Sequence, residues 1–113
     1  MRLKDKVAII TGGGRGIGKA IALGFANQGA HIVVAARTES EVISVAEKVR
    51  EIGRESLGVV CDISDENQVK NLVDATIKKF NRVDVLINNA GIGSMRPVYA
   101  MQLESFEKVL KVN

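Results

Sequence analysis

The chain has 113 residues, of which 46% are hydrophobic and 26% charged, an ordinary globular composition that allows one small domain. Its formal net charge of +3 is spread along the sequence and only 4% of its residues are aromatic, which argues against nucleic-acid binding. One cysteine, Cys61, excludes an internal disulfide, and the single histidine, His31, lies far from it in sequence, so no metal site is expected.

Four short apolar runs predict the strands of a parallel sheet. The first run follows a charged start and is too short for a secretion signal or a membrane span, so we expect a cytoplasmic protein without a membrane partner. Valine and isoleucine occupy consecutive positions in the runs, as they do in strands buried on both faces. In chain order the runs are VAII (7–10), HIVVAA (31–36), LGVVCD (57–62) and VDVLIN (83–88).

Helical patterns separate these runs and predict an α/β fold. Asp65 is placed to cap the third helix, and Gly29 and Gly53 fall where the first two helices should end. The alternation predicts a doubly wound, Rossmann-type parallel sheet in strand order 3-2-1-4. The expected buried stripes are Ile17, Ile21, Gly24 and Phe25, then Val42, Val45, Ala46, Val49 and Ile52, then Val69, Leu72, Val73, Ile77 and Phe80.

A glycine-rich stretch, TGGGRGIGKA (11–20), stands between the first strand and the first helix, where a phosphate group can bind. Read from Gly13 it approaches the triphosphate loop G-x-x-x-x-G-K-[ST], but Ala20 lacks the hydroxyl that would hold magnesium. Read from Thr11 it suits the pyrophosphate of a dinucleotide, although its spacing, G-x-x-x-G-x-G, also fits a plain tight connection. The glycines that would turn the chain and approach the pyrophosphate are Gly12, Gly16 and Gly18.

Four motifs in this order resemble the amino-terminal half of a short-chain dehydrogenase/reductase. They are TGGGRGIG (11–18), CDI (61–63), NNAG (88–91) and a final VN (112–113). The resemblance implies that the chain is a dinucleotide-binding domain. It also implies that the protein moves a hydride between a nicotinamide cofactor and the alcohol or carbonyl carbon of a small-molecule substrate.

The resemblance also assigns cofactor contacts. It implies that Asp62 accepts a hydrogen bond from the adenine amino group, beside the backbone of Ile63, although a strand-end cap is an alternative role for this aspartate. It implies that Asn88 ties neighbouring strands together. The remaining residues expected at the cofactor are Ile17, at the start of the first helix, and Asn89, Ala90 and Gly91, whose alternative is a simple turn.

The residues after the second strand indicate NADP rather than NAD. NAD enzymes carry an acid there that binds the ribose hydroxyls, but this chain has Ala36, followed by Arg37 and Thr38. Arg37 can bind a 2′-phosphate, and Arg15 resembles the loop arginine of the family's phosphate-preferring members. A solvated surface position is the alternative for each arginine.

The family's catalytic tyrosine-x-x-x-lysine pair is missing from the 113 residues, because Tyr99 is followed four positions later by Leu103. Asn113 resembles the family's active-site asparagine, on a helix that resembles a dimer surface. We therefore expect an NADP-dependent oxidoreductase, homo-oligomeric when complete, whose residues 1–113 form the cofactor-binding domain, incomplete at its carboxyl end and inactive alone. A non-catalytic dinucleotide-binding module stays open as an alternative.

Overall fold

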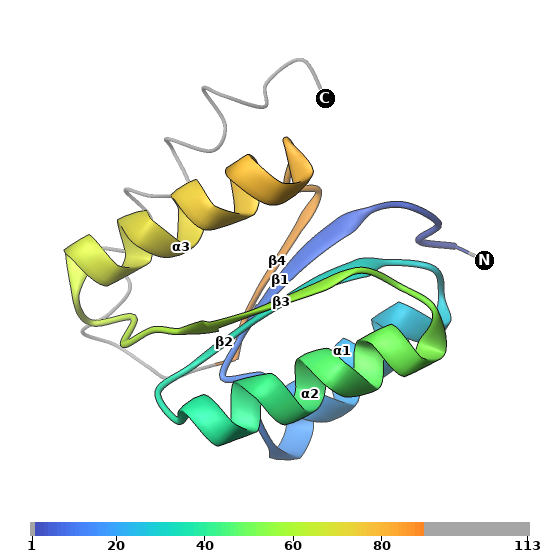
Figure 1. Cartoon of the computed structure of the whole chain (residues 1–113), viewed down its shortest axis with the longest axis horizontal. Helices are drawn as coiled ribbons and strands as arrows, with labels where there is room; N and C mark the ends of the chain where they lie inside the picture. Colours follow the sequence, from blue (N-terminus) through green and yellow to red (C-terminus); the bar gives the residue numbers. More distant parts are fainter. Residues whose placement is uncertain (1, 90–113) are drawn as a thin grey trace.

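A computed structural model describes residues 2–89, in which a central sheet lies between two layers of helices (Figure 1). The four strands are all parallel and follow the order β3-β2-β1-β4, which confirms the order predicted from the sequence. The elements are β1 (Val7–Thr11), α1 (Gly16–Asn27), β2 (His31–Ala36), α2 (Glu39–Ile52), β3 (Ser56–Val60), α3 (Glu66–Phe80) and β4 (Val85–Asn88).

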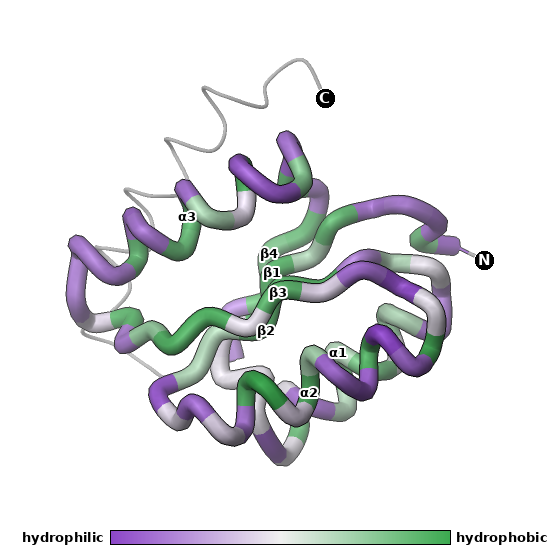
Figure 2. Tube along the Cα trace, in the orientation of Figure 1, coloured by the Kyte–Doolittle hydropathy of each residue, from purple (hydrophilic) through white to green (hydrophobic). Residues whose placement is uncertain are grey.

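The helices cover the sheet unequally, with α1 and α2 on one face and α3 on the other (Figure 1). Successive residues of β1 therefore meet different partners. Ile9 belongs to the core beneath α3, while Ile10 belongs to the core beneath α1 and α2. Both side chains are fully buried, and each such burial stabilises the fold by about 1.5–3 kcal/mol. Figure 2 shows the matching pattern, with apolar residues along the strands and polar residues on the outer sides of the helices.

Asp65, Gly29 and Gly53 lie at helix ends, where the sequence predicted them. The Asp65 carboxylate accepts hydrogen bonds from the backbone N–H groups of Asn67 and Gln68 at the start of α3. Gly29 and Gly53 adopt positive φ angles of 98° and 99° just after α1 and α2, a conformation that suits glycine. These three predictions are confirmed.

The buried face of α1 differs from the predicted one. Ile17 is 72% exposed, and the buried residues of the helix are Gly18, Ala22 and Ala26. Small side chains on this face let the helix axis approach the sheet closely, so the larger residues stand at its margins. The expected stripe was therefore wrong at Ile17 and Gly24, which are exposed, whereas Ile21 and Phe25 are partly buried and pack against the core. In α2 the stripe is correct except for its last residue, Ile52, which is 37% exposed.

The third strand is less buried than predicted and starts and ends earlier, at Ser56–Val60 rather than 57–62. In the described part of the chain β3 pairs only with β2, so it forms an edge of the sheet. Val60 is accordingly 48% exposed, whereas Cys61, just past the strand, is buried against α3. Burial, with the charges of Asp62 and Asp65, raises the pKa of the Cys61 thiol to about 11.

The fourth strand begins at Val85, two residues later than predicted. The residue before it, Asp84, uses its side chain to accept a hydrogen bond from the Val7 N–H at 2.8 Å. Burial alone would raise the pKa of Asp84, but hydrogen bonds from Arg82 and Val7 outweigh it and hold the pKa below its ordinary value. Asp84 thus fixes the start of β4 beside β1.

Candidate functional site

The glycine-rich loop turns at the carboxyl end of β1 and leads directly into α1. Gly12 and Gly16 have positive φ angles of 64° and 59°, which allow this turn. Gly18 is glycine for another reason, because a Cβ atom there would overlap the Gly12 carbonyl oxygen and lie 2.7 Å from the Asn89 side-chain nitrogen. The loop therefore needs glycine for its backbone angles and for the close approach of α1 to β1.

The amino terminus of α1 is open to an anion. Arg15 precedes the helix without a side-chain capping bond, the first turn contains no acid, and the Lys19 N–H donates to the Arg15 carbonyl at 3.2 Å. The N–H groups of the three residues between them have no earlier carbonyl within the helix to bind. The helix dipole also favours negative charge at this end. By contrast, α2 and α3 both carry acids in their first turns.

Thr11 and Asn89 hold the loop against β4. The buried Thr11 hydroxyl lies 3.3 Å from both the Ile87 carbonyl and the Asn88 side-chain oxygen, to either of which it can donate. It also accepts a hydrogen bond from the Asn89 N–H at 3.1 Å. The Asn89 side chain donates to the Gly12 carbonyl at 3.4 Å. The asparagine pair at the end of β4, Asn88 and Asn89, is thereby joined to the glycine-rich loop that follows β1.

Asp62 lies just past β3 in a compact local turn. The Ser64 hydroxyl and N–H both donate to one of its carboxylate oxygens, at 2.7 and 3.0 Å. These two bonds, and more weakly the positive charge of Arg37, lower the pKa of Asp62, so its carboxylate is ionised at neutral pH. Ile63 is buried in the core, so that only its backbone is available to a ligand. The local turn fits the strand-end role, and Arg37 lies within electrostatic reach.

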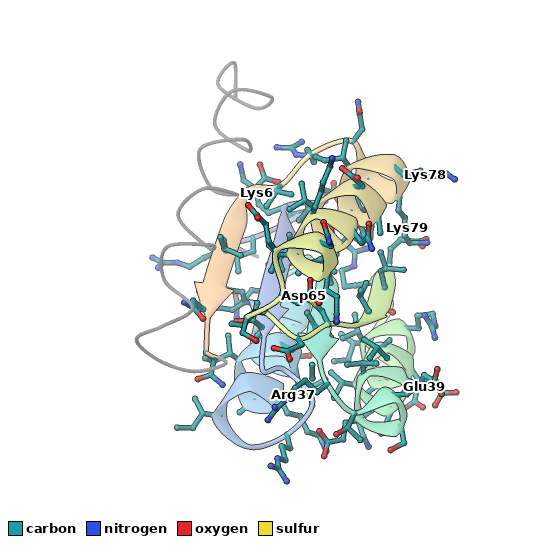
Figure 3. The ribbon with its side chains drawn as sticks, turned by 90° about the vertical axis from the view of Figure 1, so that its left-hand side faces the viewer. Lys6, Arg37, Glu39, Asp65, Lys78 and Lys79 are labelled. Carbon is teal, nitrogen blue, oxygen red and sulfur yellow. The ribbon has the colours of Figure 1, made fainter. Side chains whose placement is uncertain are left out.

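The end of β2 presents the residues on which the predicted cofactor preference depends. Ala36 ends the strand, Arg37 is exposed, and Thr38 precedes α2 without a side-chain capping bond. Within residues 2–89, neither Arg37 nor Arg15 forms an ion pair. Figure 3 shows Arg37 and Glu39 toward the same end of the sheet, with Lys6 at the opposite end. Both arginines therefore lie at the edge of the sheet where β1 and β2 end.

Glu41 also belongs to this edge, although the sequence patterns did not single it out. It is the third residue of α2, and its side chain contacts Gly14 of the loop. The sequence position of Glu41 could have indicated this, since the first turn of a helix that follows β2 must lie near the carboxyl ends of the strands. Ala90, Gly91 and Asn113 lie outside the described residues.

Residues 2–89 also bear on two other kinds of site. This part of the chain contains no group of three or more histidine, cysteine, aspartate or glutamate residues that could hold a metal ion. None of its helices is long and apolar enough to cross a membrane. The candidate site is therefore the edge formed by the glycine-rich loop and the ends of the four strands.

Comparisons with known proteins agree with this geometry. A relative from Thermotoga maritima, named an uncharacterized oxidoreductase, is 43% identical over 111 residues, which are 98% of this chain and 43% of the relative. L-Sorbose reductase from Gluconobacter frateurii, solved with NADPH and L-sorbose, is 41% identical with a TM-score of 0.77 and covers 83% of this chain and 37% of its own. NAD⁺-bound xylitol dehydrogenase is 35% identical with a TM-score of 0.78, covering 81% of this chain and 35% of its own.

The chain thus spans less than half the length of these relatives, with the match at their Rossmann-type fold. A family model described as short chain dehydrogenase matches residues 6–113, nearly the whole chain. That match includes every motif on which the resemblance rested. The chain belongs to the short-chain dehydrogenase family.

Proposed function

We propose that the complete protein is an NADP-dependent oxidoreductase that transfers a hydride between the nicotinamide cofactor and the carbonyl or alcohol carbon of a small molecule. The single observation that carries the cofactor assignment is the edge where β1 and β2 end, with Ala36 in place of an acid and with Arg15 and Arg37, which form no ion pair within residues 2–89. The related structures contain NADPH in one case and NAD⁺ in another, so the preference depends on this chain's own residues.

The pyrophosphate would bind at the open amino terminus of α1, where the dipole and free N–H groups favour an anion. Gly12, Gly16 and Gly18 would let the backbone approach it, with Ile17 beside it on the exposed side. On the adenosine side, we propose contacts from Asp62, the Ile63 backbone and Thr38. The segment Asn89, Ala90 and Gly91 would line the ribose.

The two arginines would bind the 2′-phosphate from opposite sides. A hydrogen bond to a charged group contributes about 1.5–3 kcal/mol, and both arginines are exposed, so solvent and salt reduce this contribution. Together they should favour NADP over NAD by roughly ten- to several-hundredfold. Bound NADP supplies the hydride donor or acceptor, while the residues of this domain bind and orient it.

The catalytic step needs residues that the 113 do not include, since no tyrosine-x-x-x-lysine occurs among them. We propose that residues 1–113 form the dinucleotide-binding domain and have no turnover alone. For the complete protein we propose a cytoplasmic, homo-oligomeric enzyme in which Asn113 is part of the active site. A non-catalytic dinucleotide-binding module is the second candidate.

Direct titration of the complete protein with NADPH and NADH tests the proposal, using the rise in nicotinamide fluorescence on binding. We expect NADPH to bind at least about tenfold more tightly. Oxidation of NADPH by a panel of ketones, aldehydes and sugars then separates an enzyme from a binding module. Equal affinities would refute the cofactor assignment, and tight NADPH binding without turnover on any carbonyl would favour the module.

A further inference from the structure

Glu41 brings a carboxylate into contact with the glycine-rich loop. An ideal Cβ atom on Gly14 would lie 2.7 Å from the Glu41 Cβ and 2.8 Å from one oxygen of its carboxylate. The same point lies 3.5 Å from the Cβ of Ala36. The carboxylate of Glu41 therefore reaches the part of the edge where the strand itself provides alanine instead of an acid.

This contact explains why residue 14 is glycine. Among the glycines of the loop, Gly12 and Gly16 have positive φ angles, whereas Gly14 does not, so its backbone angles are open to other residues. A side chain at position 14 would instead collide with Glu41. Glycine at this position keeps room for the glutamate against the loop.

The charge of Glu41 has no partner in the part of the chain that the structure describes. Its carboxylate forms neither a hydrogen bond nor an ion pair with the described residues. The side chain is half-buried, which weakens screening by solvent. Its negative charge is thus available to act on whatever binds at this edge.

We propose that Glu41 is a specificity-determining residue that opposes the 2′-phosphate of NADP. The inference rests on the proposed function, which brings the adenosine ribose to the edge formed by Gly14, Ala36 and Arg37. A 2′-phosphate carries nearly two negative charges, so a neighbouring carboxylate repels it, while a ribose without the phosphate has no charge to repel. Glu41 therefore reduces the preference for NADP that Arg15 and Arg37 create.

Two small probes, 2′,5′-ADP and 5′-AMP, isolate this effect because they differ only in the 2′-phosphate. Calorimetric titration of the complete protein measures both affinities for the wild type, for Glu41→Gln, and for Glu47→Gln as the matched control. Glu47 is an exposed glutamate of the same helix, so its substitution changes net charge equally.

We expect Glu41→Gln to tighten the binding of 2′,5′-ADP roughly three- to tenfold and to leave the binding of 5′-AMP unchanged, and the effect on 2′,5′-ADP should decrease only partly as salt rises. Glu47→Gln should change neither affinity. If Glu41→Gln behaves like Glu47→Gln at low salt, or weakens 5′-AMP, the inference is overturned while the proposed function stands. If the wild type prefers 5′-AMP or binds neither probe, the NADP assignment fails and this inference fails with it.

Discussion

Gly18 offers the sharpest test of how the loop is built. In Gly18→Ala, the new methyl group would overlap the Gly12 carbonyl oxygen and lie 2.7 Å from the Asn89 side-chain nitrogen. The nearest obstacle is backbone, which cannot rotate away as a side chain can, so the start of α1 must move off β1. Overpacking of this kind typically costs about 1–3 kcal/mol. The move should also disturb the N–H groups at the start of α1, and NADPH binding should weaken with stability.

Gly24→Ala is the matched control in the same helix. A Cβ atom at Gly24 would have nothing within 4 Å, and alanine is favoured over glycine inside a helix by about 0.8–1 kcal/mol. Urea unfolding of the complete protein should therefore show opposite effects, a loss for Gly18→Ala and a gain for Gly24→Ala. Equal stability of the two variants, or unchanged NADPH affinity in Gly18→Ala, would refute the proposed close approach of α1 to β1.

Three further substitutions test separate contacts. Arg37→Ala should weaken NADP binding by about 1–3 kcal/mol and leave NAD nearly unchanged in parallel titrations, whereas equal losses would make Arg37 structural. Asp65→Ala should lower the free energy of unfolding by about 1 kcal/mol, because it removes the α3 cap, and exposed Asp74→Ala in the same helix should not. Ser64→Ala should raise the pKa of Asp62 toward 3.8 in a carboxyl NMR titration, because it removes the first cause of its lowering; an unchanged titration would contradict that. Since the folded pKa of Asp62 is lowered, its contribution to stability is present above about 3.8 and is lost as pH falls through the lowered value, a loss that Ser64→Ala should reduce.

The sequence predicted the elements that depend on local patterns. Consecutive Val and Ile marked buried parallel strands, and Asp65 and Gly53 marked helix ends, because caps and turns need particular residues whatever surrounds them. The prediction for α1 was wrong at Ile17 and Gly24 for a related reason. The buried residues of this helix are Gly18, Ala22 and Ala26. Their side chains are so small that a search for periodic large apolar residues does not find this face.

The contacts that join distant segments could not be predicted in the same way. The bonds from Thr11 to the residues that end β4 depend on the parallel pairing of β1 with β4, across more than seventy positions of sequence. The contact of Glu41 with Gly14 depends on where the first turn of α2 lies relative to the loop. Sequence spacing predicted that these segments share an edge, but not which side chains meet there.

Cofactor preference at this edge therefore cannot be predicted from the acid position at the end of β2 alone. That rule works because a carboxylate at the strand end binds the ribose hydroxyls and repels a 2′-phosphate. Here the strand provides Ala36, but α2 brings the carboxylate of Glu41, four positions beyond Arg37, against Gly14 of the neighbouring loop. A half-buried carboxylate acts through less solvent than an exposed arginine does, so one such acid can offset part of the attraction of two arginines. The proposed preference for NADP would then be a difference between opposed charges, and the contribution of the arginines should depend on salt more steeply than that of Glu41.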